Sequence, residues 1–260
     1  ICWCNNYKCR RMDIKLRDRF IELWNKYFNN AELPITFYYS DSLKGVKESE
    51  KPGGHSCMIC DLTKIRNGQS LGFTKSSIGC GGGQKYSGFS DKLRPGFEYF
   101  LSCGKPDMEG ERYKQDPETV RLFLEDMPHI HKKNKVMIFK RWDQLTEQDE
   151  PEVAIFFNQA DVISGLFMLA NYDFIGNAGV ISPFSSGCGS IITYPYMEKD
   201  KEKPRSILGM FDPSARPCVK ANELTFATPV NRLFQMLDYF EESFLITKTW
   251  DTMNKRIAKS

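Results

Sequence analysis

Leu33-Pro34-Ile35-Thr36-Phe37-Tyr38-Tyr39 and Pro151-Glu152-Val153-Ala154-Ile155-Phe156-Phe157 are two similar stretches, one in each half of the chain. Aromatic and β-branched residues dominate both, so each predicts a buried β-strand. A second similar pair follows, Ser77-Ile78-Gly79-Cys80-Gly81 and Ser186-Gly187-Cys188-Gly189-Ser190, and a further cysteine ends each half, Cys103 and Cys218. This repeated order favours an internal duplication, with chance similarity as the alternative.

The rest of the pattern predicts an α+β fold. Two related lobes, at about 30–140 and 150–228, are each expected to hold a short mixed β-sheet, bracketed by an N-terminal helix and C-terminal helices. Apolar residues at spacings of three and four predict a helix from Asp13. Asp116 and Pro117 carry the signature of another helix start. A C-terminal helical segment is expected over 229–259, with a break near 246–249.

The chain begins with a polar stretch that contains Cys2, Cys4 and Cys9 and ends at Arg10-Arg11-Met12. It shows no apolar periodicity. We therefore treat residues 1–11 as an appendage and 12–259 as a single family domain, which leaves six cysteines in its body.

Composition excludes several classes of protein. With 260 residues, 41% hydrophobic and 27% charged, the chain matches a globular domain rather than a disordered or fibrous one. A net charge of +3 does not indicate nucleic acid or an anionic membrane as partner, and no apolar run reaches the ~20 residues of a membrane-spanning helix. Nine cysteines without a preceding hydrophobic signal segment favour a reducing cytoplasm, where thiols fill cores, ligate metals or carry out redox chemistry.

Gly79-Cys80-Gly81-Gly82-Gly83 is the most distinctive local motif. Consecutive glycines allow backbone N–H groups to line a concavity for an anion or a cluster sulfide, whereas the structural alternative is a tight turn with an inward cysteine. Cys57-Met58-Ile59-Cys60 is a CxxC pair at the apolar start of a predicted helix. A zinc site usually needs a second close pair, which is missing from the sequence. Arg216 is placed to lower the pKa of Cys218 or to pair with an anionic ligand.

Several motifs together resemble one family. They are Asp13-Ile14-Lys15-Leu16-Arg17-Asp18, 34–39, Cys57-Met58-Ile59, Gly79-Cys80-Gly81-Gly82 with Tyr86-Ser87-Gly88-Phe89, Phe139-Lys140-Arg141-Trp142, Ser186-Gly187-Cys188, Leu208-Gly209-Met210-Phe211-Asp212, Ala215-Arg216-Pro217-Cys218 and Glu242-Ser243-Phe244-Leu245. Over about residues 12–259 the chain is similar to the cysteine-rich archaeal and bacterial family called domain of unknown function 169. The resemblance implies a soluble protein of anaerobic prokaryotes and carries no established reaction. Cys2, Cys4 and Cys9 depart from the family pattern.

Two functions follow from these residues. In the first, Cys80, Cys103, Cys188 and Cys218 converge between the lobes and ligate an iron–sulfur cluster, with Cys57 or Cys60 in reserve. Backbone N–H groups of Gly79, Gly81, Gly82, Gly187 and Gly189 would face the cluster, and Arg216 would offset its charge. The protein would then be a redox or electron-transfer accessory with a redox partner protein.

The alternative is a non-redox binding module for a small anionic ligand, with buried or zinc-bound cysteines. A thiol-nucleophile enzyme is a third reading, for which the sequence offers His55 as the base. Whether the protein is an enzyme stays open.

Overall fold

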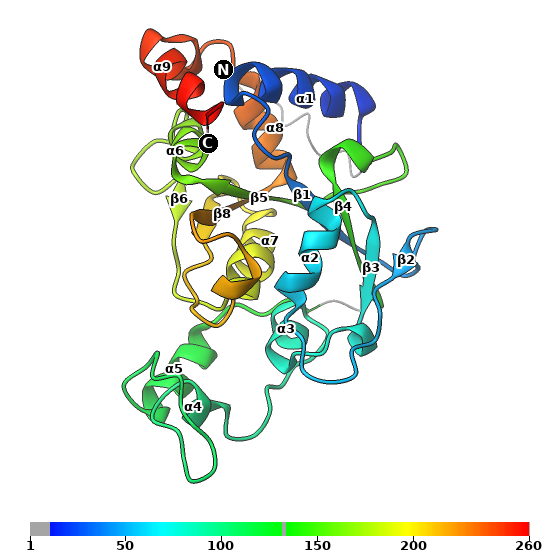
Figure 1. Cartoon of the computed structure of the whole chain (residues 1–260), viewed down its shortest axis with the longest axis vertical. Coiled ribbons are helices and arrows are strands. Elements are labelled where there is room, and N and C mark those ends of the chain that lie inside the picture. The colour runs from blue at the N-terminus through cyan, green and yellow to red at the C-terminus, as the bar shows by residue number, and fades with distance from the viewer. Residues whose placement is uncertain (1–10, 132–133, 260) are drawn as a thin grey trace.

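The computed structural model describes residues 11–131 and 134–259, and across them the chain forms one eight-stranded sheet in the order β2-β3-β4-β1-β5-β8-β7-β6 (Figure 1). The strands are β1 Ile35–Ser40, β2 Lys47–Glu48, β3 Leu71–Thr74, β4 Val136–Arg141, β5 Val153–Gln159, β6 Val180–Ile181, β7 Ser206–Gly209 and β8 Glu223–Pro229. The α-helices are α1 Ile14–Phe28, α2 Met58–Arg66, α3 Gly81–Tyr86, α4 Phe97–Phe100, α5 Pro117–Asp126, α6 Ala160–Ala170, α7 Tyr194–Glu198, α8 Val230–Asp238 and α9 Lys248–Ile257. A π-helical segment, η3 (Gly189–Thr193), runs directly into α7, and a 3₁₀ turn, η4 (Arg216–Cys218), precedes β8.

The sheet has a symmetrical strand order. Exchanging β1–β4 with β5–β8 gives the same order read from the opposite edge of the sheet. In both halves the outermost pair is parallel while the inner pairs are antiparallel. The α+β class and the bracketing helices are thus confirmed. The expectation of a separate sheet in each lobe needs correction, because β1 and β5 pair at the centre, with Ile35 opposite Ile155. This pairing removes two edges that would otherwise expose unpaired backbone groups. Internal duplication stays a prediction.

Helices cover both faces of the sheet (Figure 1). Successive side chains of β5 point to opposite faces of the sheet and so enter different cores. Phe156 belongs to the core formed with α1, α6, α8 and α9, whereas Ile155 and Phe157 belong to the core formed with α2 and α7. Phe20 and Trp24 of α1 lie against Phe156, with ring centroids 6.3 Å and 5.1 Å away. The central strands are therefore buried on both sides, which explains their continuous apolar sequences.

Helix starts follow the predicted capping residues. Asp13 accepts a 2.8 Å hydrogen bond from the N–H of Lys15, and Asp116 accepts one of 2.7 Å from Thr119 ahead of Pro117. The C-terminal segment departs from expectation, because α8 already ends at Asp238. The turn behind it carries Phe240 into the core, fully buried and 5.9 Å from the ring of Phe28.

The described chain is anchored from its first residues. Met12 is buried, and its N–H donates a 2.8 Å hydrogen bond to the carbonyl oxygen of Asp149. The predicted appendage cysteines Cys2, Cys4 and Cys9 lie outside the described residues. Among the helices described, none combines the length and the apolar character needed to cross a membrane.

Candidate functional site

A cavity of about 640 Å³ is lined by residues of the α4–α5 segment and by residues of the helices and loops packed on the sheet. Figure 1 shows the α4–α5 segment projecting from the rest of the fold. The cavity wall includes three free thiols, those of Cys57, Cys80 and Cys188. Aromatic side chains form much of the remainder: Tyr86, Phe97, Phe100, Tyr113, Phe123, Phe184 and Phe211. A volume of this size accommodates an organic ligand or a metal cofactor, so this is the candidate site.

Each of the three thiols lies at the start of a helix. Cys57 caps α2 and Cys80 caps α3, whereas Cys188 lies in the first turn of the continuous helix of η3 and α7, which Ser186 caps by accepting a hydrogen bond from the N–H of Gly189. The helix N-terminus carries partial positive charge, which favours a thiolate over a thiol. The three helices therefore bring three such positions to one cavity.

Local sequence explains why Cys80 and Cys188 face inward. A Cβ on Gly79 would stand 2.8 Å from the carbonyl oxygen of Gly54, so only glycine lets the 52–56 loop close over this turn. A Cβ on Gly187 would stand 2.4 Å from Ile59 Cδ1. Both Gly-Cys turns therefore depend on a glycine that admits a close neighbour.

Two of the thiols, those of Cys57 and Cys188, favour their protonated form when no cation is near. Burial raises the pKa of Cys188 well above its usual value, and the neighbouring Cys57, Cys80 and Asp212 raise it further. Burial also raises the pKa of Cys57, although the N–H groups of Ile59 and Cys60 at the start of α2 oppose it. Any metal that binds here must displace protons from these thiols.

Asp212 is a site residue that the cysteine and glycine patterns did not single out. Its carboxylate accepts hydrogen bonds from the N–H of Gly187 at 3.1 Å and from the N–H and hydroxyl of Ser214 at 3.0 Å and 2.7 Å. The N–H of Gly189 donates to Ser186 Oγ at 3.1 Å. Two of the backbone donors predicted for a ligand are thus already used within the protein. The signal in the sequence that could have identified Asp212 is the turn Asp212-Pro213-Ser214, in which Asp212 is the first residue.

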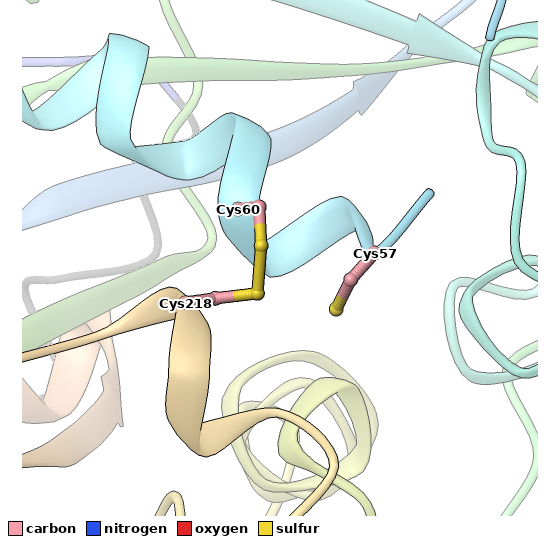
Figure 2. A group of neighbouring side chains, drawn as sticks. All are labelled: Cys57, Cys60 and Cys218. Carbon is pink, nitrogen blue, oxygen red and sulfur yellow. A yellow bond between two sulfur atoms is a disulfide. The ribbon is translucent and has the colours of Figure 1, made fainter. Parts of the chain in front are cut away.

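A disulfide stands beside the cavity. It joins Cys60 of α2 to Cys218 of η4, and the sulfurs of Cys57, Cys60 and Cys218 all lie within 4.8 Å of one another. Figure 2 shows the Cys57 sulfur next to the bridge. Cys60 is exposed to solvent, whereas Cys57 and Cys218 are half-buried.

The structure brings together five of the six body cysteines: Cys57, Cys60, Cys80, Cys188 and Cys218. Cys103 lies apart from them, exposed in the turn after α4, where the N–H of Gly104 bonds to the Tyr99 carbonyl and ends the helix. Cys80 and Cys188 do not occupy matching places in the strand order, since Cys80 follows β3 and Cys188 precedes β7. By strand order, the counterpart of Cys188 is Cys57.

Arg216 has a different role from the one expected. Its guanidinium donates hydrogen bonds to four backbone carbonyl oxygens, those of Met210, Lys220, Ala221 and Glu223. These contacts close the loop between β7 and β8. The side chain therefore shapes the loop that carries Cys218 instead of facing an anionic ligand.

The family model described as uncharacterised ArCR, DUF169, matches residues 25–238, which is most of the chain and includes every site residue named above. The chain belongs to the DUF169 family. No curated protein and no solved structure matches it. The match confirms the family resemblance that the sequence motifs predicted.

Proposed function

We propose that this DUF169 protein holds an iron–sulfur cluster at the cavity and serves as a redox or electron-transfer accessory in the cytoplasm of an anaerobic prokaryote. Cys57, Cys80 and Cys188 are the primary ligands. Cys60 or Cys218 supplies the fourth thiolate once their disulfide is reduced. This set replaces the one expected from the sequence, because Cys103 is exposed outside the cavity wall.

The convergence on one cavity of three thiols from the starts of three helices is the observation that carries the proposal. Thiols gathered beside the carboxylate of Asp212 resist ionisation, as the raised pKa values of Cys57 and Cys188 indicate. A cluster reverses this preference, because iron binds thiolates and the helix N-termini favour the same charge. The surrounding aromatic side chains exclude water, which is one determinant of cluster potential.

The disulfide must be reduced before the cluster can gain its fourth thiolate ligand. While Cys60 and Cys218 are bonded to each other, neither offers a thiolate, and three ligands remain. Reducing conditions release both sulfurs within 4.8 Å of Cys57. An anaerobic, reducing cytoplasm is therefore the compartment in which this site would fill, with a redox partner protein exchanging its electrons.

The test is anaerobic reconstitution of the reduced protein with ferrous iron and sulfide. Visible absorption and the iron and sulfide content per chain are measured before and after desalting. Wild type and Cys103→Ser should retain iron and sulfide in equal amounts, whereas Cys57→Ser, Cys80→Ser and Cys188→Ser should each lose most of both. A colourless, iron-free wild type would contradict the proposal, as would equal loss from Cys103→Ser.

A zinc-bound binding module is the second candidate. Cys57, Cys60 and Cys218 lie within 4.8 Å of one another, which is compact enough for three thiolates around a single ion of zinc. The small anionic ligand of that reading is less favoured, because Asp212 and Glu111 both line the cavity. Zinc in place of iron after purification from metal-supplemented cultures, with no sulfide, would favour this candidate.

A further inference from the structure

Cys60 has two sulfur neighbours close enough to serve as its disulfide partner. One is Cys218, to which it is bonded across 158 residues of sequence. The other is Cys57, whose sulfur lies within 4.8 Å of both (Figure 2). The N–H of Cys60 donates a 3.1 Å hydrogen bond to the carbonyl oxygen of Cys57, and this turn brings the two residues' backbones together. Cys57–Cys60 is thus a second pairing open to the same sulfur.

We propose that Cys57, Cys60 and Cys218 form a thiol–disulfide exchange site, in which Cys57 takes Cys60 from Cys218. Cys57 gives up its proton, and its sulfur attacks Sγ of Cys60. The Cys60–Cys218 bond breaks as the Cys57–Cys60 bond forms, and Cys218 leaves as a thiolate that takes up a proton. One disulfide is lost and one is made, so the step needs no external oxidant or reductant.

The position of Cys57 suits it to the role of attacking thiol. It caps the nine-residue helix α2, whose first N–H groups stabilise a thiolate. Thiol–disulfide exchange proceeds through the thiolate, so the rate rises with pH, by about tenfold per unit while the attacking thiol is mostly protonated.

The exchange changes how the cavity wall is held. In the Cys60–Cys218 form, the bridge ties η4, and with it the wall residues from Asp212 to Ala215, to α2. In the Cys57–Cys60 form, the bridge closes within the start of α2, and η4 keeps only non-covalent contacts, among them the Arg216 hydrogen bonds to backbone carbonyls. The freed Cys218 becomes a reactive thiol, and Cys57 leaves the set of cavity thiols.

Peptide mapping tests the exchange directly. Trypsin leaves Lys51-Pro52 and Arg216-Pro217 uncut, so Cys57 and Cys60 share the peptide 48–64 and Cys218 lies in 206–220. The Cys60–Cys218 form gives these peptides cross-linked, and the Cys57–Cys60 form gives them separate. Oxidised, chelator-treated protein is incubated at several pH values, quenched in acid, alkylated and digested. The exchange involves no metal, so its outcome is independent of the cluster.

The expected result is a rise of the separate peptides with time in wild type and in Cys103→Ser, faster at each higher pH and at a rate independent of protein concentration. Cys57→Ser and Cys57→Ala should stay cross-linked throughout. Wild type that remains fully cross-linked at every pH would overturn the proposal. Equal exchange in the Cys57 variants would overturn it too, because another thiol would then be the attacking group.

Discussion

Cys57 and Cys188 occupy matching places in the symmetrical sheet. Each lies at the start of the helix that connects the second and third strands of its half: β2 to β3 through α2, and β6 to β7 through η3 and α7. Their surroundings nevertheless differ. Cys57 is half-buried beside the Cys60–Cys218 bridge. Cys188 is buried in the hydrophobic core between the sheet and the α2 and α7 helices, a core that also contains Ile191. The two thiols therefore differ in chemistry although their positions in the fold correspond.

Alkylation rates should reflect this difference. Burial and the raised pKa both slow the reaction of Cys188, so Cys103 should react first in the native protein and Cys188 last, with about a tenfold or larger separation. Mass spectrometry of iodoacetamide-treated protein over time measures each site. In denaturant the rates should converge. A Cys188 that reacts as fast as Cys103 in folded protein would contradict the burial of Cys188.

Gly187→Ala and Gly81→Ala form a matched pair of glycine variants. A Cβ at position 187 would collide with Ile59 Cδ1 at 2.4 Å and approach Ala215 Cβ at 2.8 Å, whereas one at position 81 meets nothing within 4 Å. We expect Gly187→Ala to cost about 1–3 kcal/mol in the free energy of unfolding. Gly81→Ala, in the exposed first turn of α3, should be neutral or stabilise by up to about 1 kcal/mol.

Denaturant unfolding of both glycine variants measures these free energies. A large loss of stability in Gly81→Ala would show that Gly81 is needed for the fold. Normal stability with loss of reconstituted iron in that variant would instead return Gly81 to the site as the backbone donor that the sequence predicted.

Asp149 should make the fold sensitive to acid. Burial alone would raise the pKa of this carboxyl, but hydrogen bonds from Tyr38 at 2.5 Å and Lys140 at 2.9 Å outweigh it and hold the pKa below its usual value of 3.8. A depressed carboxyl pKa contributes stability above the unfolded value that is lost as the pH falls through the folded one. The loss attributable to Asp149 should therefore begin near 3.8 and continue below it.

Asp149→Asn separates this contribution from general acid effects. It leaves Lys140 buried without its partner, so we expect a loss of about 3–5 kcal/mol at neutral pH and a shallower decline in acid. Glu50→Gln is the control, because the Lys47–Glu50 pair is well exposed and should contribute less than about 0.5 kcal/mol. An unchanged acid profile in Asp149→Asn would exclude Asp149 as the titrating group.

The helices and strands that the sequence predicted correctly are determined by residues close to one another in the chain. β1, β5 and α1 are marked by their own side-chain periodicity, and Asp13 and Asp116 cap helices through bonds two or three residues away. The pairing of β1 with β5 depends on edges that meet only after folding, so composition and spacing could not reveal it. Without this pairing, the sequence predicted one sheet in each half instead of a single shared sheet.

The candidate site was predictable in residue type more than in arrangement. Cys57, Cys80 and Cys188 could be recognised from CxxC and Gly-Cys-Gly, but likeness of sequence paired Cys80 with Cys188, where the strand order pairs Cys57 with Cys188. Cys60 and Cys218 are joined across 158 residues, and no local signal connects them. Arg216 illustrates the same limit, because its carbonyl partners are defined by the closure of a loop.

Reduction of the Cys60–Cys218 bridge should lower stability substantially. The bridge closes a loop of 158 residues, and the chain-entropy model gives about 5 kcal/mol for a loop of this length, with measured values more often about 2–4 kcal/mol. Cys60→Ser and Cys218→Ser should match reduced wild type within about 0.5 kcal/mol, since all three lack the same constraint. Equal stability of oxidised and reduced wild type would mean that the bridge does not form in solution.

The same arithmetic distinguishes the two pairings of Cys60. A Cys57–Cys60 bond closes a loop of a few residues, for which the chain-entropy model gives only about 2 kcal/mol. Oxidised wild type that has exchanged at high pH should therefore unfold at lower denaturant than oxidised Cys57→Ser, which keeps the long-range bridge. We expect the gap to approach about 3 kcal/mol as exchange nears completion, and to disappear in dithiothreitol. If the two oxidised proteins unfold together at every pH, the bridge stays between Cys60 and Cys218, and Cys57 acts as a thiol of the cavity alone.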